Sequence, residues 1–360
     1  MAVTSYTQSV GDLVSSTLQN TKSKVVDNIF KKSWYLSNLE GRKEMEEGGI
    51  RIDRSIEYGT NGTFQSYYGY DMVPIVPQET VTDTIWTWKE LQANWVISRR
   101  ELRQNTGKAK IRSLIETKKK SMERSFREGM NTQLLNPSTF TGGDTTGNSS
   151  KDLMPLCALV STTAMTVGKI SESTSSYWAN QRLKSASANQ TTTNGSTFVN
   201  ECRSFSNTCG QNSDGFPNLG VWDKRMYEAF VAVLDTKVRY SSTDTARNGF
   251  RSVMCENMEV YWDQIVPRVT SAADPTTLIA YTNTTLTTSE SIGYFLNTDF
   301  IYLIVDSGTD FVMTPAVEHQ AAGQQATSGA MLFMGEHICT NRRAQGVLYG
   351  VATNKLTLTS

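Results

Sequence analysis

The sequence predicts an α+β protein whose parts are extended rather than packed around one compact core. Three observations indicate this class. Two strand-like segments flank a stretch at 59–80 that is rich in Gly, Tyr and Pro, a long helix with one narrow apolar stripe follows at 107–136, and mixed helices and strands occupy the rest. In that remainder we expect helices at 198–208 and 224–234 and strands at 219–222, 252–264, 294–305 and 345–352. The chain of 360 residues is long enough to bury a sizeable core. Its hydrophobic fraction of 38% is a little low for a compact globule.

The first 40 residues predict an arm that packs on another part of the molecule. Scattered apolar positions between Leu13 and Phe30 suit one or two weak amphipathic helices. These few side chains could not form a core of their own. The sequence at 46–49 (EEGG) then interrupts the arm.

A long β-hairpin is predicted from 50 to 97. Alternate apolar residues of 50–58 share one face of a strand, and a second strand returns at 81–97 with a bulge at Lys89-Glu90. A two-stranded ribbon is only marginally stable in water. We therefore expect Trp86, Trp88 and Trp95 to bury against an adjacent copy of the chain, which would make the hairpin an intersubunit clamp.

The tip of this hairpin carries the aromatic residues Tyr67, Tyr68 and Tyr70. Such a cluster can stack on nucleic-acid bases. No Lys or Arg lies between Arg54 and Lys89 to hold phosphates, so the sequence favours a packing tip instead.

The helix at 107–136 is the clearest element of the sequence. Its apolar positions follow the i, i+3, i+4 rule, and Asn136-Pro137 ends it. A helix of this length spans about 45 Å at 1.5 Å per residue. Because only one stripe is apolar, we expect the helix to lie on a surface.

Charge is distributed unevenly, although Lys+Arg and Asp+Glu balance at 35 each. The segment 99–127 holds 11 basic and three acidic side chains, whereas 269–341 has seven acidic side chains and no Lys or Arg. Copies of the chain could meet head to tail, with Arg99 and Arg103 pairing with Asp306 and Asp310 of a neighbour. The alternatives are pairing within one subunit, separate solvation of the two segments, and contact of the basic face with DNA.

No motif for catalysis, cofactor binding or metal binding is present. The two histidines, His319 and His337, do not form H-E-x-x-H, and neither a phosphate-binding loop nor G-x-S-x-G occurs. The five cysteines form no C-x-x-C pair, and an odd count argues against a disulfide scaffold. No apolar run approaches the ~20 residues of a membrane helix, and we expect no secretory signal. Enzymatic function is therefore disfavoured.

Four stretches resemble, in the same order, motifs of one branch of the major capsid proteins of tailed double-stranded DNA bacteriophages, which have the Hong Kong 97 phage fold. They cover the chain from about 48 to 352. The stretches are GGIRI at 48–52 with YGTNGTFQSYYGYD at 58–71, IWTWK at 85–89 with VIS at 96–98, FLNTDFIY at 295–302, and TN at 340–341 with QGVL at 345–348. The region 177–216 departs from the family pattern.

The resemblance implies a structural subunit divided into an N-terminal arm, an extended β-hairpin loop, a peripheral domain with a long spine helix, and an axial domain. The arm would cover 1–47, the extended loop 48–97, the peripheral domain 98–155 with 306–360, and the axial domain 156–305. Hexamers and pentamers would tile an icosahedral virion head around packaged double-stranded DNA, bound without sequence specificity. Cement, scaffolding and portal proteins are further implied partners, and assembly would occur in the host bacterial cytoplasm, with no membrane contact.

An encapsulin-like compartment of the same fold is the alternative, and would assemble without DNA. In the founding member of the family that this chain resembles, a covalent cross-link joins a lysine of the hairpin to an asparagine of a neighbouring subunit. Because no lysine lies between Lys43 and Lys89, we expect no such cross-link here.

Overall fold

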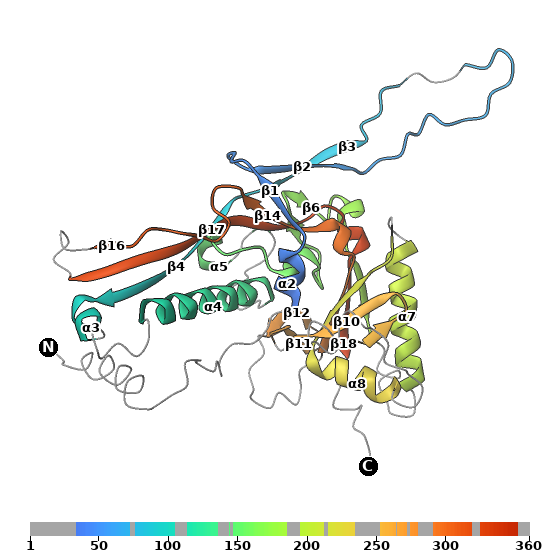
Figure 1. Ribbon diagram of the computed structural model, residues 1–360. Helices are drawn as coiled ribbons and strands as arrows, with labels where there is room; N and C mark the ends of the chain where they lie inside the picture. Colours follow the sequence, from blue (N-terminus) through green and yellow to red (C-terminus); the bar gives the residue numbers. More distant parts are fainter. Residues whose placement is uncertain are drawn as a thin grey trace.

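In the computed structural model of the protein, the following residues are described: 34–72, 76–104, 114–135, 144, 147–185, 195–211, 215–234, 253–263, 265–271, 274–279, 291–318 and 325–351. Two six-stranded sheets organise these residues (Figure 1).

The first sheet is built around the long strand β17 (Ala326–Cys339) and is called the β17 sheet below. One edge of β17 pairs with the whole of β4 (Lys89–Ser98). The other edge pairs in turn with β14 (Ile301–Asp306), β15 (Val312–Met313) and β16 (Val317–Glu318). The short strand β1 (Lys43–Glu46) lies parallel to β14. β4, β16 and β17 extend to the left in Figure 1.

Helix α4 (Leu114–Leu135) lies along this sheet (Figure 1). Its buried face includes Met122, Phe126, Met130 and Leu134, which confirms that part of the predicted stripe. Ile115, another predicted member of the stripe, is exposed, and positions 107–113 and 136 of the predicted helix lie outside the described residues. Of the arm, helix α2 (Trp34–Glu40) packs on α4 and β14 with Tyr35, Leu36 and Leu39 buried, while the expected helices before residue 34 also lie outside. A short helix α3 (Arg99–Gln104) follows β4.

The second sheet, called the β13 sheet, has the order β7-β18-β13-β8-β10-β9. Its strands are β7 (Gln181–Lys184), β18 (Gly346–Val351), β13 (Ser291–Leu296), β8 (Leu219–Trp222), β10 (Met258–Trp262) and β9 (Val253–Cys255). Helices α7 (Gly195–Gln211) and α8 (Lys224–Leu234) pack against it around Trp222 and Phe295. The predicted helices in these regions and the strand at 219–222 are confirmed, but the predicted strand at 252–264 is the two strands β9 and β10.

Shorter elements make up the rest of the described secondary structure. They are the turn α5 (Gly147–Ser150), α6 (Leu156–Leu159), β5 (Thr166–Val167), β6 (Ile170–Ser171), the 3-10 helices η3 (Ser176–Trp178), η6 (Thr298–Phe300) and η8 (Arg342–Ala344), and the pair β11 (Arg268–Ser271) and β12 (Asp274–Ile279). No helix among the described residues is long and apolar enough to cross a membrane.

The sheets cut across the boundaries that the sequence predicted for the peripheral and axial parts. The expected single strand at 294–305 is broken by η6, so β13 belongs to one sheet and β14 to the other. The chain crosses back after β17, and β18, expected with 306–360, pairs with β13. The physical reason is hydrogen-bond pairing between segments far apart in sequence, which local patterns do not reveal.

The hairpin is also shorter than predicted. Strand β2 (Ile52–Glu57) pairs with β3 (Val81–Trp86), and Thr87-Trp88 separates β3 from β4. The change of alternation that predicted a bulge at Lys89-Glu90 is therefore not a bulge within one strand. It is the point where the chain leaves the hairpin and enters the β17 sheet.

Candidate interaction surface on the hairpin

The root of the hairpin is tied to the body by charge and by packing. Arg54 of β2 forms ion pairs with Glu44, at 2.9 Å, and with Glu46, at 2.5 Å, both on β1. Ile52 and Ile56, which share a face of the strand with Arg54, are buried. Along β2 covered side chains alternate with exposed ones, which is the ordinary pattern of a strand with one covered face.

The tryptophans do not need a second copy to be buried, which corrects the expectation from the sequence. Trp86 is 2% exposed and Trp95 is 5% exposed within the single chain. The indole of Trp86 donates to Thr84 Oγ1 at 3.2 Å, and Lys119 of α4 lies 5.3 Å from the ring centre of Trp95. Trp88 is half-buried against the same core. The expectation placed all three tryptophans in an unsupported two-stranded ribbon. In the structure, β4, which carries Trp95, is covered by the β17 sheet and by α4.

The tyrosines of the tip have no such cover. Tyr67, Tyr68 and Tyr70 are exposed, and so are Phe64 and Met72 beside them. Figure 1 shows this loop projecting away from both sheets. Large apolar side chains gathered on one projection indicate an interaction surface, because isolated proteins rarely expose them together.

The tip is also acidic. Residues 55–88 contain no Lys or Arg but include Glu57, Asp71 and Glu79. Asp71 shapes the turn, since its carboxylate accepts from the backbone N–H of Tyr68 at 2.9 Å. A partner for this surface should therefore offer both apolar area and positive charge.

Positive charge is concentrated on α3 and α4. Arg99 and Arg103 are exposed on α3, and Lys120 is exposed on α4. Lys118 pairs with Glu101 at 4.0 Å and Arg127 pairs with Glu40 at 3.4 Å within the chain.

The acidic partners expected for Arg99 and Arg103 are engaged within their own chain. Asp310 pairs with Lys43 at 2.5 Å, and both side chains are largely covered. Asp306 accepts from the Thr309 hydroxyl at 2.8 Å and from the Gly48 and Gly308 N–H groups. The Thr309 hydrogen bond is the main reason that the pKa of Asp306 is lowered. For these two residues, pairing within one subunit is the interpretation that the structure favours.

A buried titratable cluster lies where β17 meets α2 and the chain before α6. Burial raises the pKa of Glu336 to about 8. The hydrogen bonds that its carboxylate accepts from the Met154 and His337 N–H groups, at 2.8 and 3.0 Å, act in the opposite direction and lower that pKa. Burial lowers the pKa of His337 to about 4. Its ring nitrogens contact the Tyr35 hydroxyl and the Met154 carbonyl, each at 2.9 Å. The sequence offered no sign of this cluster, because its members are distant along the chain.

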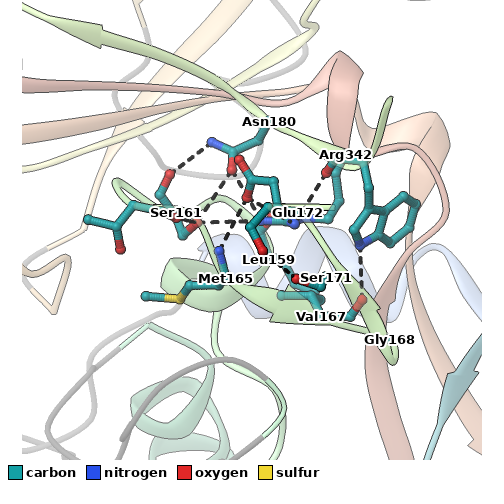
Figure 2. A network of polar contacts seen from close by, with 12 residues as sticks. Leu159, Ser161, Met165, Val167, Gly168, Ser171, Glu172, Asn180 and Arg342 are labelled. Carbon is teal, nitrogen blue, oxygen red and sulfur yellow. Dashed lines mark hydrogen bonds and ion pairs between the residues drawn. The ribbon is translucent and has the colours of Figure 1, made fainter. Parts of the chain in front are cut away.

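A second polar cluster, also missed by sequence reasoning, surrounds Glu172 (Figure 2). Glu172 pairs with Arg182 at 2.5 Å and with Arg342 at 3.5 Å. Arg342 is fully buried and also donates to the Leu159 carbonyl at 2.8 Å. Burial lowers the pKa of Arg342 to about 10, and Glu172 opposes that shift. Each charge in the cluster is thus compensated by hydrogen bonds as well as by an opposite charge.

Sequence comparison identifies no relative: no protein-family model matches the chain, and no curated protein matches it. Comparison of the structure with solved structures finds similar proteins. The chain is similar to a subunit of the cyanophage A-1(L) capsid asymmetric unit, with 11% identity, a TM-score of 0.57, and coverage of 95% of this chain and 99% of that one.

Two further similarities agree with it. A Mycobacterium phage Ogopogo structure has 10% identity and a TM-score of 0.54 over 93% of this chain and 98% of that chain. The capsid of an empty GTA particle has 9% identity and a TM-score of 0.54 over 92% and 94%. The protein therefore has the α+β fold of Hong Kong 97-type capsid subunits, as the sequence predicted.

Proposed function

We propose that the protein is the major capsid protein of a tailed bacteriophage, with many copies forming hexamers and pentamers that close into an icosahedral head around double-stranded DNA. The observation that carries this proposal is the likeness in fold to capsid chains over almost the full length of both partners. The exposed aromatic tip agrees with it, because a subunit in a shell covers such a surface with its neighbour.

The proposed contact places the hairpin tip of one subunit on the α3–α4 surface of the next. Tyr67, Tyr68 and Tyr70 supply apolar area, and Glu57 and Glu79 supply negative charge. Arg99 and Arg103 supply exposed positive charge on the receiving subunit. Opposite charge steers two surfaces together and fixes their register more than it raises affinity.

The remaining assignments follow from a capsid role. The subunit would act as a structural component of the virion rather than as an enzyme, and would assemble in the host bacterial cytoplasm. Packaged DNA would be contacted without sequence specificity, through basic side chains and phosphates. Portal, scaffolding and cement proteins are the other partners that we propose for such a head.

Negative-stain electron microscopy of the purified protein tests the proposal. We expect closed shells, and small monodisperse particles would contradict the proposal. Shells that form and fill with protein cargo in cells lacking phage DNA would instead indicate an encapsulin-like compartment.

Deleting residues 59–80 tests the role of the tip. The expected product is a folded subunit, with unchanged far-UV circular dichroism, that makes no stable shells. Normal shells from this variant would contradict the proposed contact. The control is Glu228→Ala, because Glu228 is exposed on α8 and belongs neither to the hairpin nor to the α3–α4 surface.

A further inference from the structure

The turn between β5 and β6 touches the root of the hairpin at β3. The Ile85 N–H donates to the Gly168 carbonyl at 3.1 Å. The indole of Trp86 lies so close that a Cβ on Gly168 would be 3.0 Å from Trp86 Cζ2. On the other strand, Tyr58 stacks on Tyr177, just beyond the turn, with ring centres 4.7 Å apart.

The backbone of this turn has a conformation that few residues adopt. Gly168 has φ of +62° and Lys169 has φ of +64°. Both N–H groups point to one carboxylate, since Asp144 accepts from Gly168 at 2.7 Å and from Lys169 at 3.0 Å. Hydrogen bonds to an ionised acceptor are about twice as strong as neutral ones, so Asp144 holds the turn in this strained form.

The other end of the same segment is fixed in the protein interior. Glu172 follows β6 directly and is held by Arg182 and the buried Arg342. The Trp178 indole donates to the Val167 carbonyl at 2.9 Å. Figure 2 shows Glu172 and Arg342 beside the segment that carries Gly168. The buried core and the hairpin root are therefore joined through one short piece of chain.

A two-stranded ribbon has little stiffness of its own, so its direction depends on what holds its root. On the β2 side the holding group is Arg54 with its β1 carboxylates. On the β3 side it is the turn at Gly168.

We propose that the β5–β6 turn is a latch that sets the direction of the hairpin, with Asp144, Gly168 and Glu172 as its positioning residues. Asp144 holds the shape of the turn, Gly168 allows β3 and Trp86 to approach, and Glu172 ties the turn to the core. The inference concerns a single subunit and goes beyond the proposed assembly, since the latch acts whether or not copies associate.

The test measures the distance between two spin labels by pulsed electron paramagnetic resonance. The labels are attached at Thr60→Cys, on the hairpin, and Ser125→Cys, on α4, both of which are exposed. The five native cysteines are buried and free, so they compete poorly for the label. The unaltered latch should give a single narrow distance.

Gly168→Ala and Asp144→Asn should each lose that narrow distance and give a broad distribution. The matched control is Gly69→Ala in the tip. It imposes the same kind of backbone strain, with φ of +56°, but its Cβ meets nothing within 4 Å. The control should keep the narrow distance.

A wild-type distribution in both latch variants would overturn the proposal. If circular dichroism shows Gly168→Ala to be unfolded, Asp144→Asn decides alone, because it keeps the size of the side chain and removes its charge and one of the two oxygens that accept from the turn. Since the measurement is made on one subunit, a failed latch can be told apart from failed shell assembly.

Discussion

The β13 sheet and the hairpin tip use similar side chains in opposite ways. Every residue of β13 is buried, and Phe295 on it packs against Phe205 and Trp222 with ring centres 5.0 and 5.5 Å away. No described residue between Tyr58 and Thr80 is buried, and Phe64 is 94% exposed. The β13 region is therefore fully packed within one subunit, whereas the hairpin tip leaves a large apolar surface that its own subunit does not cover.

Truncating one phenylalanine in each region should give the largest contrast. Phe295→Ala is expected to lower the free energy of unfolding by about 3–5 kcal/mol, because a buried aromatic ring leaves a cavity. Phe64→Ala should leave it unchanged. Chemical denaturation of unassembled subunits measures both, and equal losses would show that the tip packs on its own subunit.

The buried region should also respond to pH in a way that the tip does not. Folded Glu336, with a pKa of about 8, keeps its proton to higher pH than an unfolded glutamate, whose pKa is about 4.3. Between these values the folded state binds more protons, so this group makes stability fall as pH rises toward 8. Glu336→Gln can accept the same N–H groups and should remove that slope.

The window for this measurement is about pH 6.5 to 8. His337, with a folded pKa of about 4, has the opposite effect: the unfolded state binds more protons, so stability rises with pH until about 6.5. Above that value His337 is neutral in both states. Urea titrations of wild type and Glu336→Gln in this window should diverge, and parallel curves would contradict the shifted pKa.

Charge reversal on the proposed receiving surface should have a smaller effect. Arg99→Glu is expected to slow shell assembly by about twofold to fivefold at low salt, since exposed charge pairs contribute little each. Light scattering follows the rate, and Lys184→Glu on β7 is the control for net charge. Unchanged assembly with reduced DNA retention would favour a DNA-facing basic surface instead.

Denaturing gels of assembled particles should show no covalent cross-links between subunits. The hairpin between Lys43 and Lys89 has no lysine, and Lys89 itself is buried, with its ammonium donating to the Ser150 carbonyl. One band near 40.0 kDa is the expected pattern. A ladder of higher bands would mean that another nucleophile joins the subunits.

Local patterns in the sequence were sufficient for elements that depend on neighbours in the chain. The part of the apolar stripe from Met122 to Leu134 on α4 and the strand β2 were both predicted. The end of the hairpin at Thr87-Trp88 was not predicted, because the residues on both sides of it have strand character. Only the pairing of β4 with β17 separates β4 from β3. Glu172 and Arg342, which are 170 positions apart, gave no local signal. Two of the four residues expected to carry intersubunit charge pairs, Asp306 and Asp310, were predicted from composition, which does not reveal their partners within the chain.

The direct passage from β3 into β4 has a mechanical consequence. A neighbour that pulls on the hairpin loads β4 along its own axis, because only Thr87 and Trp88 intervene. The hydrogen bonds between β4 and β17 run across that axis, so the pull shears the whole 10-residue ladder at once instead of unzipping it rung by rung. Tension from a neighbouring subunit would thus be spread over β17, the longest strand among the described residues.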